Sequence, residues 1–105
     1  MGLTVAKEVK QPREIIQKGY DFTGDDRLQE GDSIVLVGSS AEVFDAARQD
    51  VSTEMIVADS LDVVGNFIFV MLKEGEPGEH KLTFLAATAF GELLEEDYVF
   101  SVEEL

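Results

Sequence analysis

The sequence predicts an all-β fold, a sandwich of two antiparallel sheets. The clearest signal lies in Gly75–Val102, where a turn at Gly91 separates two runs of alternating apolar and polar side chains. Alternation with a period of two is typical of strands that bury one face. The alternating sets are His80, Leu82, Phe84, Ala86 and Thr88 in the first run, and Tyr98, Phe100 and Val102 in the second. We therefore expect a closing hairpin that turns these two sets toward the core.

The beginning of the chain predicts an arm, a strand and a loop. Residues 1–13 are mixed in character and contain the chain breaker Pro12, so we expect a short, loose N-terminal arm. A single domain then spans residues 14–105, because a chain of 105 residues suits one hydrophobic core. Its first strand is expected from Gly19 onward. In the acidic loop that follows, Leu28 is expected to insert into the core.

One region, Ser39–Met55, is ambiguous between helix and strand. A helix would be capped by Ser39 or Ser40 and would have one apolar face, made of Val43, Ala46, Ala47 and Val51. The alternative is a strand at Glu42–Asp45, a turn through Arg48, Gln49 and Asp50, and a strand at Val51–Val57. Periodicity does not decide between them. We favour strands, because the flanking segments, Asp32–Gly38 among them, are rich in β-forming residues.

Asn66–Lys73 is apolar in both of its alternating sets, which predicts a central strand covered on both faces. The alternative is an exposed edge that pairs with another chain. Six or seven short strands at even spacing are expected in total, with a turn at Asp59–Asp62. This spacing is typical of an immunoglobulin-like antiparallel sandwich.

The charge balance restricts the partners of this chain. Lys and Arg number 8 against 22 Asp and Glu, which gives a formal net charge of −14. Such a surface repels phosphate groups, so we expect neither nucleic acid nor an anionic membrane as a partner. A cationic protein, a multivalent cation or solubility alone would account for the charge. The absence of cysteine excludes disulfides and thiolate zinc sites.

The sequence also bears on targeting. The longest apolar run, Val63–Leu72, is too short to span a bilayer. The first residues lack the apolar segment of a secretory signal. We therefore expect neither membrane anchoring nor secretion by the general route.

No set of residues in the sequence assembles into a catalytic site. His80 is the only histidine, and we expect it to pack near the start of its strand with its polar edge in water. Glu95, Glu96 and Asp97 are consecutive, so their side chains alternate between faces and predict a solvated edge. The Gly75–Gly78 segment predicts a turn. We assign no catalytic, cofactor-binding or metal-binding residues, and we expect no enzymatic activity.

The acidic loop has part of the spacing of a calcium-binding loop. Asp21, Thr23, Asp25 and Asp32 occupy its first, third, fifth and twelfth positions. Asp26 stands where such a loop needs glycine, and no flanking helices are predicted. Calcium binding is thus the weaker hypothesis for this loop.

Several segments together resemble a known family. They are KQPREIIQKGYDF (residues 10–22), LQEGDSI (28–34), AEVFDAARQDVSTEMIV (41–57), GEPGEHKLTF (75–84) and GELLEEDYVFSVEE (91–104). Their order and spacing resemble the small immunoglobulin-like structural proteins of phages and prophages, the fiber-tail adaptors and neck-tail connectors. This sequence departs from the family pattern at two places, because these relatives often carry Tyr where His80 stands and Trp near Met71. The resemblance leads us to expect repacking of the core at both places.

The resemblance implies a virion structural protein without catalysis or cofactor. It would assemble in the cytoplasm of a bacterial host and join tail, neck or fibre subunits through protein–protein contacts, in several copies. Free strand edges and the N-terminal arm are the expected contact elements. The alternative is a ligand-binding sandwich, a carbohydrate-binding or calcium-dependent adhesion domain. The absence of Trp and the presence of only two tyrosines, Tyr20 and Tyr98, disfavour a sugar platform.

Overall fold

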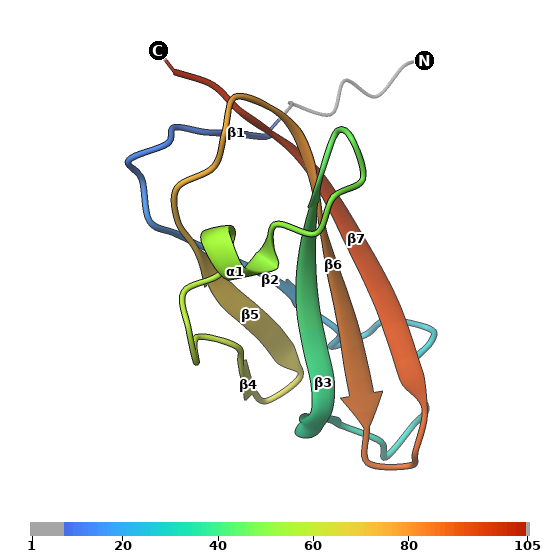
Figure 1. Cartoon of the computed structure of the whole chain (residues 1–105). Coiled ribbons are helices and arrows are strands. Elements are labelled where there is room, and N and C mark those ends of the chain that lie inside the picture. The colour runs from blue at the N-terminus through green and yellow to red at the C-terminus, as the bar shows by residue number, and fades with distance from the viewer. Residues whose placement is uncertain (1–7, 105) are drawn as a thin grey trace.

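Within residues 8–104, seven strands form two sheets that pack face to face, and one short helix follows the third strand (Figure 1). This computed structural model describes residues 8–104. The elements are β1 (Glu8–Lys10), β2 (Ile16–Asp21), β3 (Ile34–Asp45), α1 (Ser52–Met55), β4 (Asp62–Val64), β5 (Phe67–Leu72), β6 (Gly78–Thr88) and β7 (Leu93–Val102). One sheet has the order β1-β7-β6-β3 and the other the order β2-β5-β4. The prediction of an all-β sandwich is confirmed.

The β6–β7 hairpin is the longest paired unit of the fold. Its antiparallel register runs from Gly78 opposite Val102 to Ala87 opposite Leu93. All five alternating positions predicted on β6 are buried, and on β7 Phe100 and Val102 are buried while Tyr98 is half-buried. Alternation over both strands therefore identified the core-facing side of this hairpin correctly.

The core lies between the two sheets. Its fully buried apolar side chains include Phe22, Val43, Ile68, Val70, Leu72, Leu82, Phe84 and Val102. Leu28 of the acidic loop packs against this core, as predicted. Removal of these side chains from water is the main stabilising contribution to such a fold.

β5 is the central strand of its sheet, paired with β2 on one side and β4 on the other. The central position was predicted correctly, and the exposed-edge alternative is wrong. Only one face of β5 is fully covered, because Phe67, Phe69 and Met71 on the other face are half-buried. The expectation that Met71 belongs to the core is therefore corrected.

The close packing of β2 against β5 requires glycine at position 19. A Cβ atom at Gly19 would lie 2.7 Å from the ring of Phe67 and 2.7 Å from the Cβ of Phe69. These two rings stack with their centroids 5.2 Å apart. Gly19 thus gives the aromatic pair room on the outer side of the three-stranded sheet.

The ambiguous region contains both strand and helix. The strand at Glu42–Asp45 is confirmed as the end of β3, and a turn follows it. The predicted second strand, Val51–Val57, is wrong, because residues 52–55 form the single turn of α1. The Asp50 carboxylate accepts a hydrogen bond of 2.9 Å from the Ser52 amide, which bends the chain, and Met55 then enters the core.

β4 is an element that the sequence did not reveal. It pairs with β5 from Asp62 opposite Phe69 to Val64 opposite Phe67, across a tight turn at Gly65 and Asn66. The predicted turn at Asp59–Asp62 therefore ends earlier than expected. A strand of three residues is too short for periodicity to reveal.

The predicted arm differs from the structure in its second half. Residues 1–7 lie outside the described residues, whereas Glu8–Lys10 forms β1 and pairs in parallel with Phe100–Val102 of β7. Lys10 is fully buried, and its ammonium donates hydrogen bonds to the carbonyls of Gln11 (2.9 Å) and Glu74 (2.6 Å). Burial lowers the pKa of Lys10 because a desolvated ammonium is disfavoured. One buried cation thus ties β1 to the loop between β5 and β6.

We expect Lys10→Ala to lower the free energy of unfolding by about 2–4 kcal/mol, because it leaves a cavity and removes the donor from two partly buried carbonyls. Urea unfolding measures this loss. The matched control is Lys81→Ala, which truncates an exposed lysine and should change stability by less than about 0.5 kcal/mol. Equal losses in the two variants would show that the Lys10 hydrogen bonds contribute nothing.

Candidate functional site

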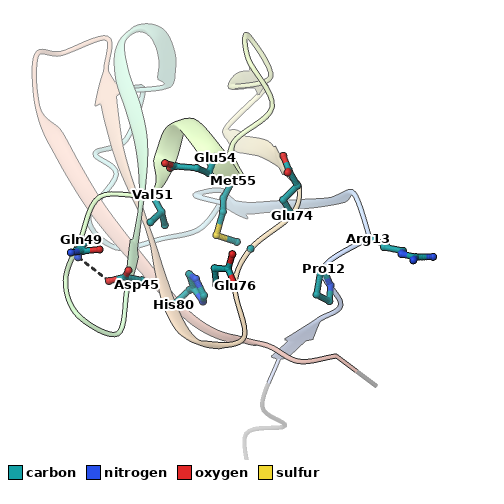
Figure 2. A pocket seen from close by; sticks show the side chains of 11 residues that line it. Pro12, Arg13, Asp45, Gln49, Val51, Glu54, Met55, Glu74, Glu76 and His80 are labelled. Carbon is teal, nitrogen blue, oxygen red and sulfur yellow. Dashed lines mark hydrogen bonds between the residues drawn. The ribbon is translucent and has the colours of Figure 1, made fainter.

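A hollow with a volume of about 590 Å³ opens beside α1 (Figure 2). It lies between the β3–α1 turn, the β5–β6 loop and the chain after β1. Its lining residues are Pro12, Arg13, Asp45, Gln49, Val51, Glu54, Met55, Glu74, Gly75, Glu76 and His80. Four carboxylates against one guanidinium give it an acidic rim, and Met55 and Val51 supply apolar surface.

His80 lies in this hollow, but its polar edge is less free than predicted. The side chain is only 4% exposed and its ring stacks on Phe100 with centroids 5.5 Å apart. Its Nδ1–H donates to the carbonyl oxygen of Gly78 at 3.0 Å. No hydroxyl or thiol side chain is among the described residues that line the hollow, so no serine, threonine or cysteine stands beside His80 there.

The structure does not bring the residues with calcium-loop spacing together as ligands. The carboxylate of Asp25 accepts two hydrogen bonds from the Arg27 guanidinium, at 2.7 and 2.9 Å, and one of 2.6 Å from the Tyr20 hydroxyl. Asp21 accepts instead from the Thr23 amide. Asp32 lies at the other end of the loop and accepts from the amide of Phe90 in the β6–β7 turn. Within the described residues, no group of three metal-ligating side chains converges.

Arg27 and Tyr98 close one side of the sandwich. Arg27 extends from the acidic loop to β7, where it donates to the Glu95 carbonyl (2.9 Å) and the Glu96 carboxylate (2.8 Å). Tyr98 of β7 donates its hydroxyl hydrogen to the Gly19 carbonyl of β2 at 2.6 Å. The Glu95 and Gly19 carbonyls lie on strand edges, at positions where no other strand pairs with β7 or β2 on that side. Side-chain donors thus cover main-chain acceptors that a foreign strand would otherwise use.

The outer edge of β3 is covered in the same way near its end. The Val43 carbonyl accepts from the Val51 amide at 2.8 Å, and the Val43 amide donates to the Ser52 hydroxyl at 2.9 Å. The Asp45 amide donates to the Gln49 carbonyl. The expectation that free strand edges serve as contact elements therefore does not fit β3 at these positions.

The outer face of the four-stranded sheet, turned away from the other sheet, is open to solvent. From β7 through β6 to β3 its rows are Leu93–Ala87–Val35, Glu95–Leu85–Ser40, Asp97–Thr83–Glu42 and Val99–Lys81–Phe44. Leu93 and Val99 are 56% and 57% exposed. The face therefore has an apolar row at the Leu93 end and an acidic band in the middle, and at the other end Val99 and Phe44 stand on either side of Lys81. At the Val99 end of this face lies a second hollow, with a volume of about 680 Å³, which Phe44 and Lys81 help to line.

A bulge of four residues interrupts β3 at the Leu93 end of this face. Between Val35, opposite Ala87, and Ser40, opposite Leu85, four residues of β3 stand against Ala86 alone. The Ala87 amide donates to the Ser39 hydroxyl at 2.8 Å, and this hydroxyl donates to the Val35 carbonyl at 2.6 Å. Gly38 adopts the left-handed conformation, with φ of 89°. The serine relay takes the place of a direct ladder bond and holds the bulge closed.

Sequence reasoning missed both the bulge and the outer face. Asp32–Gly38 was correctly predicted as β-rich, but Ser39 and Ser40 after it were considered only as possible caps of the alternative helix. Gly38 followed by a serine within a strand pattern was the available signal, because isolated glycines in strands often mark bulges. The Glu95–Asp97 run was predicted to be solvated on alternate faces. Glu95 and Asp97 do lie on the outer face, whereas Glu96 pairs with Arg27.

Comparison with known proteins yields no match for this chain among family models, curated proteins or solved structures. The only helix in residues 8–104 is a single turn, far shorter than a membrane span requires. The candidate functional surfaces of the chain are the hollow at His80 and the outer face of the four-stranded sheet.

The Asp25 network predicts an acid-sensitive component of stability. Hydrogen bonds from Arg27 and then from Tyr20 hold the pKa of Asp25 well below its ordinary value of 3.8. A carboxylate with a lowered folded-state pKa stabilises the fold above its unfolded pKa and loses that contribution as the pH falls. We expect wild type to be more stable than Asp25→Asn at pH 7, with the two curves converging below pH 3.8.

Urea unfolding at several pH values measures this convergence. Asp26→Asn is the matched control, because it removes a neighbouring carboxylate and leaves the Arg27 hydrogen bonds in place. A constant difference between wild type and Asp25→Asn from pH 7 to pH 2 would contradict the role given to Arg27.

We expect Ser39→Ala to open the β3 bulge. Removing the hydroxyl leaves the Ala87 amide and the Val35 carbonyl without their link, at a cost of about 1–2 kcal/mol. Amide hydrogen exchange at Ala87 should become faster. Ser40→Ala is the control, since Ser40 is the next residue of the strand and lies outside the relay. If the Ala87 amide exchanges equally fast in the two variants, the relay does not hold the bulge.

Proposed function

We propose that this protein is a non-enzymatic structural subunit of a tailed phage or prophage particle. It acts as an immunoglobulin-like adaptor that joins tail, neck or fibre components through protein–protein contacts in the virion. The observation that carries the proposal is the open outer face of the four-stranded sheet, where exposed apolar side chains flank an acidic band. Large exposed apolar surfaces rimmed by polar residues are typical of interaction sites.

The arrangement of the strand edges supports contact through faces. The Arg27, Tyr98 and Val51 hydrogen bonds cover positions on β7, β2 and β3, so strand addition is disfavoured there. The segments from Lys10 to the C-terminal region resemble small structural proteins of phages and prophages, and this resemblance adds the expectation of a particle subunit. A charge of −14 suits a cationic partner surface.

The alternative of a carbohydrate-binding domain gains no support from the tyrosines. Both hydroxyls form internal hydrogen bonds, Tyr20 with Asp25 and Tyr98 with Gly19. Their rings pack against the core and are only half exposed. Neither ring offers the open aromatic platform on which sugars stack.

Light scattering on the purified chain, alone and co-expressed with products of the neighbouring genes, tests the proposal. We expect a larger complex only when a tail, neck or fibre protein is present. The chain should also be found in purified particles. A chain that stays unchanged with every neighbour and is absent from particles would contradict the adaptor function.

A truncation separates the contribution of the N-terminal arm from that of the sheet. Deleting residues 1–7 preserves β1 and the Lys10 hydrogen bonds, whereas deleting residues 1–12 removes them. The shorter deletion is therefore the appropriate probe of the arm as a contact element.

A further inference from the structure

Half of the exposed large apolar side chains gather at one end of the four-stranded sheet. Among the described residues eight such side chains are exposed, and four of them lie at this end. They are Leu36 (44% exposed) and Val37 (88%) in the β3 bulge, and Phe90 (57%) and Leu93 (56%) at the β6–β7 turn. We call these four residues the bulge-end patch. Figure 1 shows the start of β3 and the β6–β7 turn at the same end of the molecule.

The register places Leu93 and the β3 bulge on either side of Ala87. Leu93 lies opposite Ala87 on one side, and Val35 lies opposite Ala87 on the other. A Cβ atom built on Gly38 would lie 3.3 Å from the Ala87 side chain. The bulge and Leu93 therefore flank Ala87, about 10 Å apart, which is two strand spacings.

Both halves of the bulge-end patch are held in place by hydrogen bonds. The Ser39 relay closes the bulge, so Val37 projects from an anchored main chain. The Phe90 amide donates to the buried carboxylate of Asp32 at 3.0 Å, which fixes the turn against the preceding loop. A fixed apolar surface loses little conformational entropy when a partner covers it.

The charges around the bulge-end patch are negative. Glu92 precedes Leu93 in the turn, Glu95 lies in the next row of the outer face, and Glu30 adjoins the loop against which Phe90 lies. The Arg27 guanidinium is already paired with Asp25 and Glu96. Lys81 lies six residues along β6 from Ala87, at a distance of about 20 Å. An apolar centre with an acidic rim is complementary to an apolar segment with a basic rim.

We propose that the bulge-end patch docks an apolar segment flanked by lysine or arginine on a partner protein. This inference rests on the proposed function, in that it assumes an interaction subunit, and it names the surface and the partner chemistry. A second copy of the chain fits less well. It would bring the same carboxylates and another net charge of −14 to the contact.

The first test uses a peptide of alternating lysine and leucine as the probe, titrated into the labelled full chain and followed by NMR. We expect amide shifts concentrated in residues 35–39 and 88–93, and weaker binding at higher salt. The double variant Val37→Ser/Leu93→Ser should bind about tenfold more weakly or worse.

The matched control is Ile15→Ser/Val64→Ser, which removes two apolar side chains that are 63% and 64% exposed elsewhere. It should bind the peptide as wild type does. All four positions are exposed, so both variants are expected to fold, and their NMR spectra check this directly.

Any of the following outcomes would overturn the proposal. The first is that a lysine–serine peptide binds as tightly as the lysine–leucine peptide, which would indicate charge alone. The second is that the control variant loses as much affinity as Val37→Ser/Leu93→Ser, or that the shifts map to another surface. The third is concentration-dependent dimerisation that Val37→Ser/Leu93→Ser abolishes, which would make a second copy the occupant.

The neighbour co-expression assay separates this proposal from the adaptor function. A neighbour complex that tolerates Val37→Ser/Leu93→Ser contradicts the bulge-end patch and leaves the adaptor function standing. Specific peptide binding without any neighbour complex or particle incorporation supports the bulge-end patch and contradicts the adaptor function.

Discussion

The pairing of β6 with β7 is the constraint on which the rest of the fold depends. β6 also pairs with β3 and β7 also pairs with β1, so the order of the four-stranded sheet follows from this hairpin. Its alternation directs His80, Leu82, Phe84, Ala86 and Thr88 into the core. The same alternation directs Thr83, Leu85 and Ala87 outward. One register therefore fixes both the interior of the protein and the rows of its outer face.

Polar side chains decide which parts of the surface are available to a partner. Arg27 and Tyr98 satisfy carbonyls on β7 and β2, and the turn after β3 satisfies Val43. The Ser39 hydroxyl has the opposite effect, because it fixes the bulge from which Val37 is exposed. The protein thus covers several strand-edge positions with hydrogen bonds and keeps apolar side chains on a face. This distribution favours contact by surface burial over strand addition.

The parts of the fold that the sequence predicted are those with a clear local pattern, which is regular alternation in the closing hairpin and a continuous apolar run in β5. The two strands of the closing hairpin, the central β5 and the inserted Leu28 all follow from local pattern. β4, α1 and β1 do not, because each has three or four residues and owes its conformation to contacts distant in sequence. Lys10 is an example, since its burial depends on the Glu74 carbonyl, 64 residues away. The bulge was equally hidden, because its relay joins Ser39 to Ala87 across two strands.

The parallel pairing of β1 with β7 has a mechanical consequence. Glu8 lies opposite Phe100 and Lys10 opposite Val102, so the two strands run in the same direction. Tension applied through the chain before Glu8 and after Val102 would pull these strands past each other along their length. Hydrogen bonds loaded in this way share the force and must break together, and the buried Lys10 side chain adds an anchor against sliding. The sandwich is therefore built to resist extension at the point where its first and last strands meet.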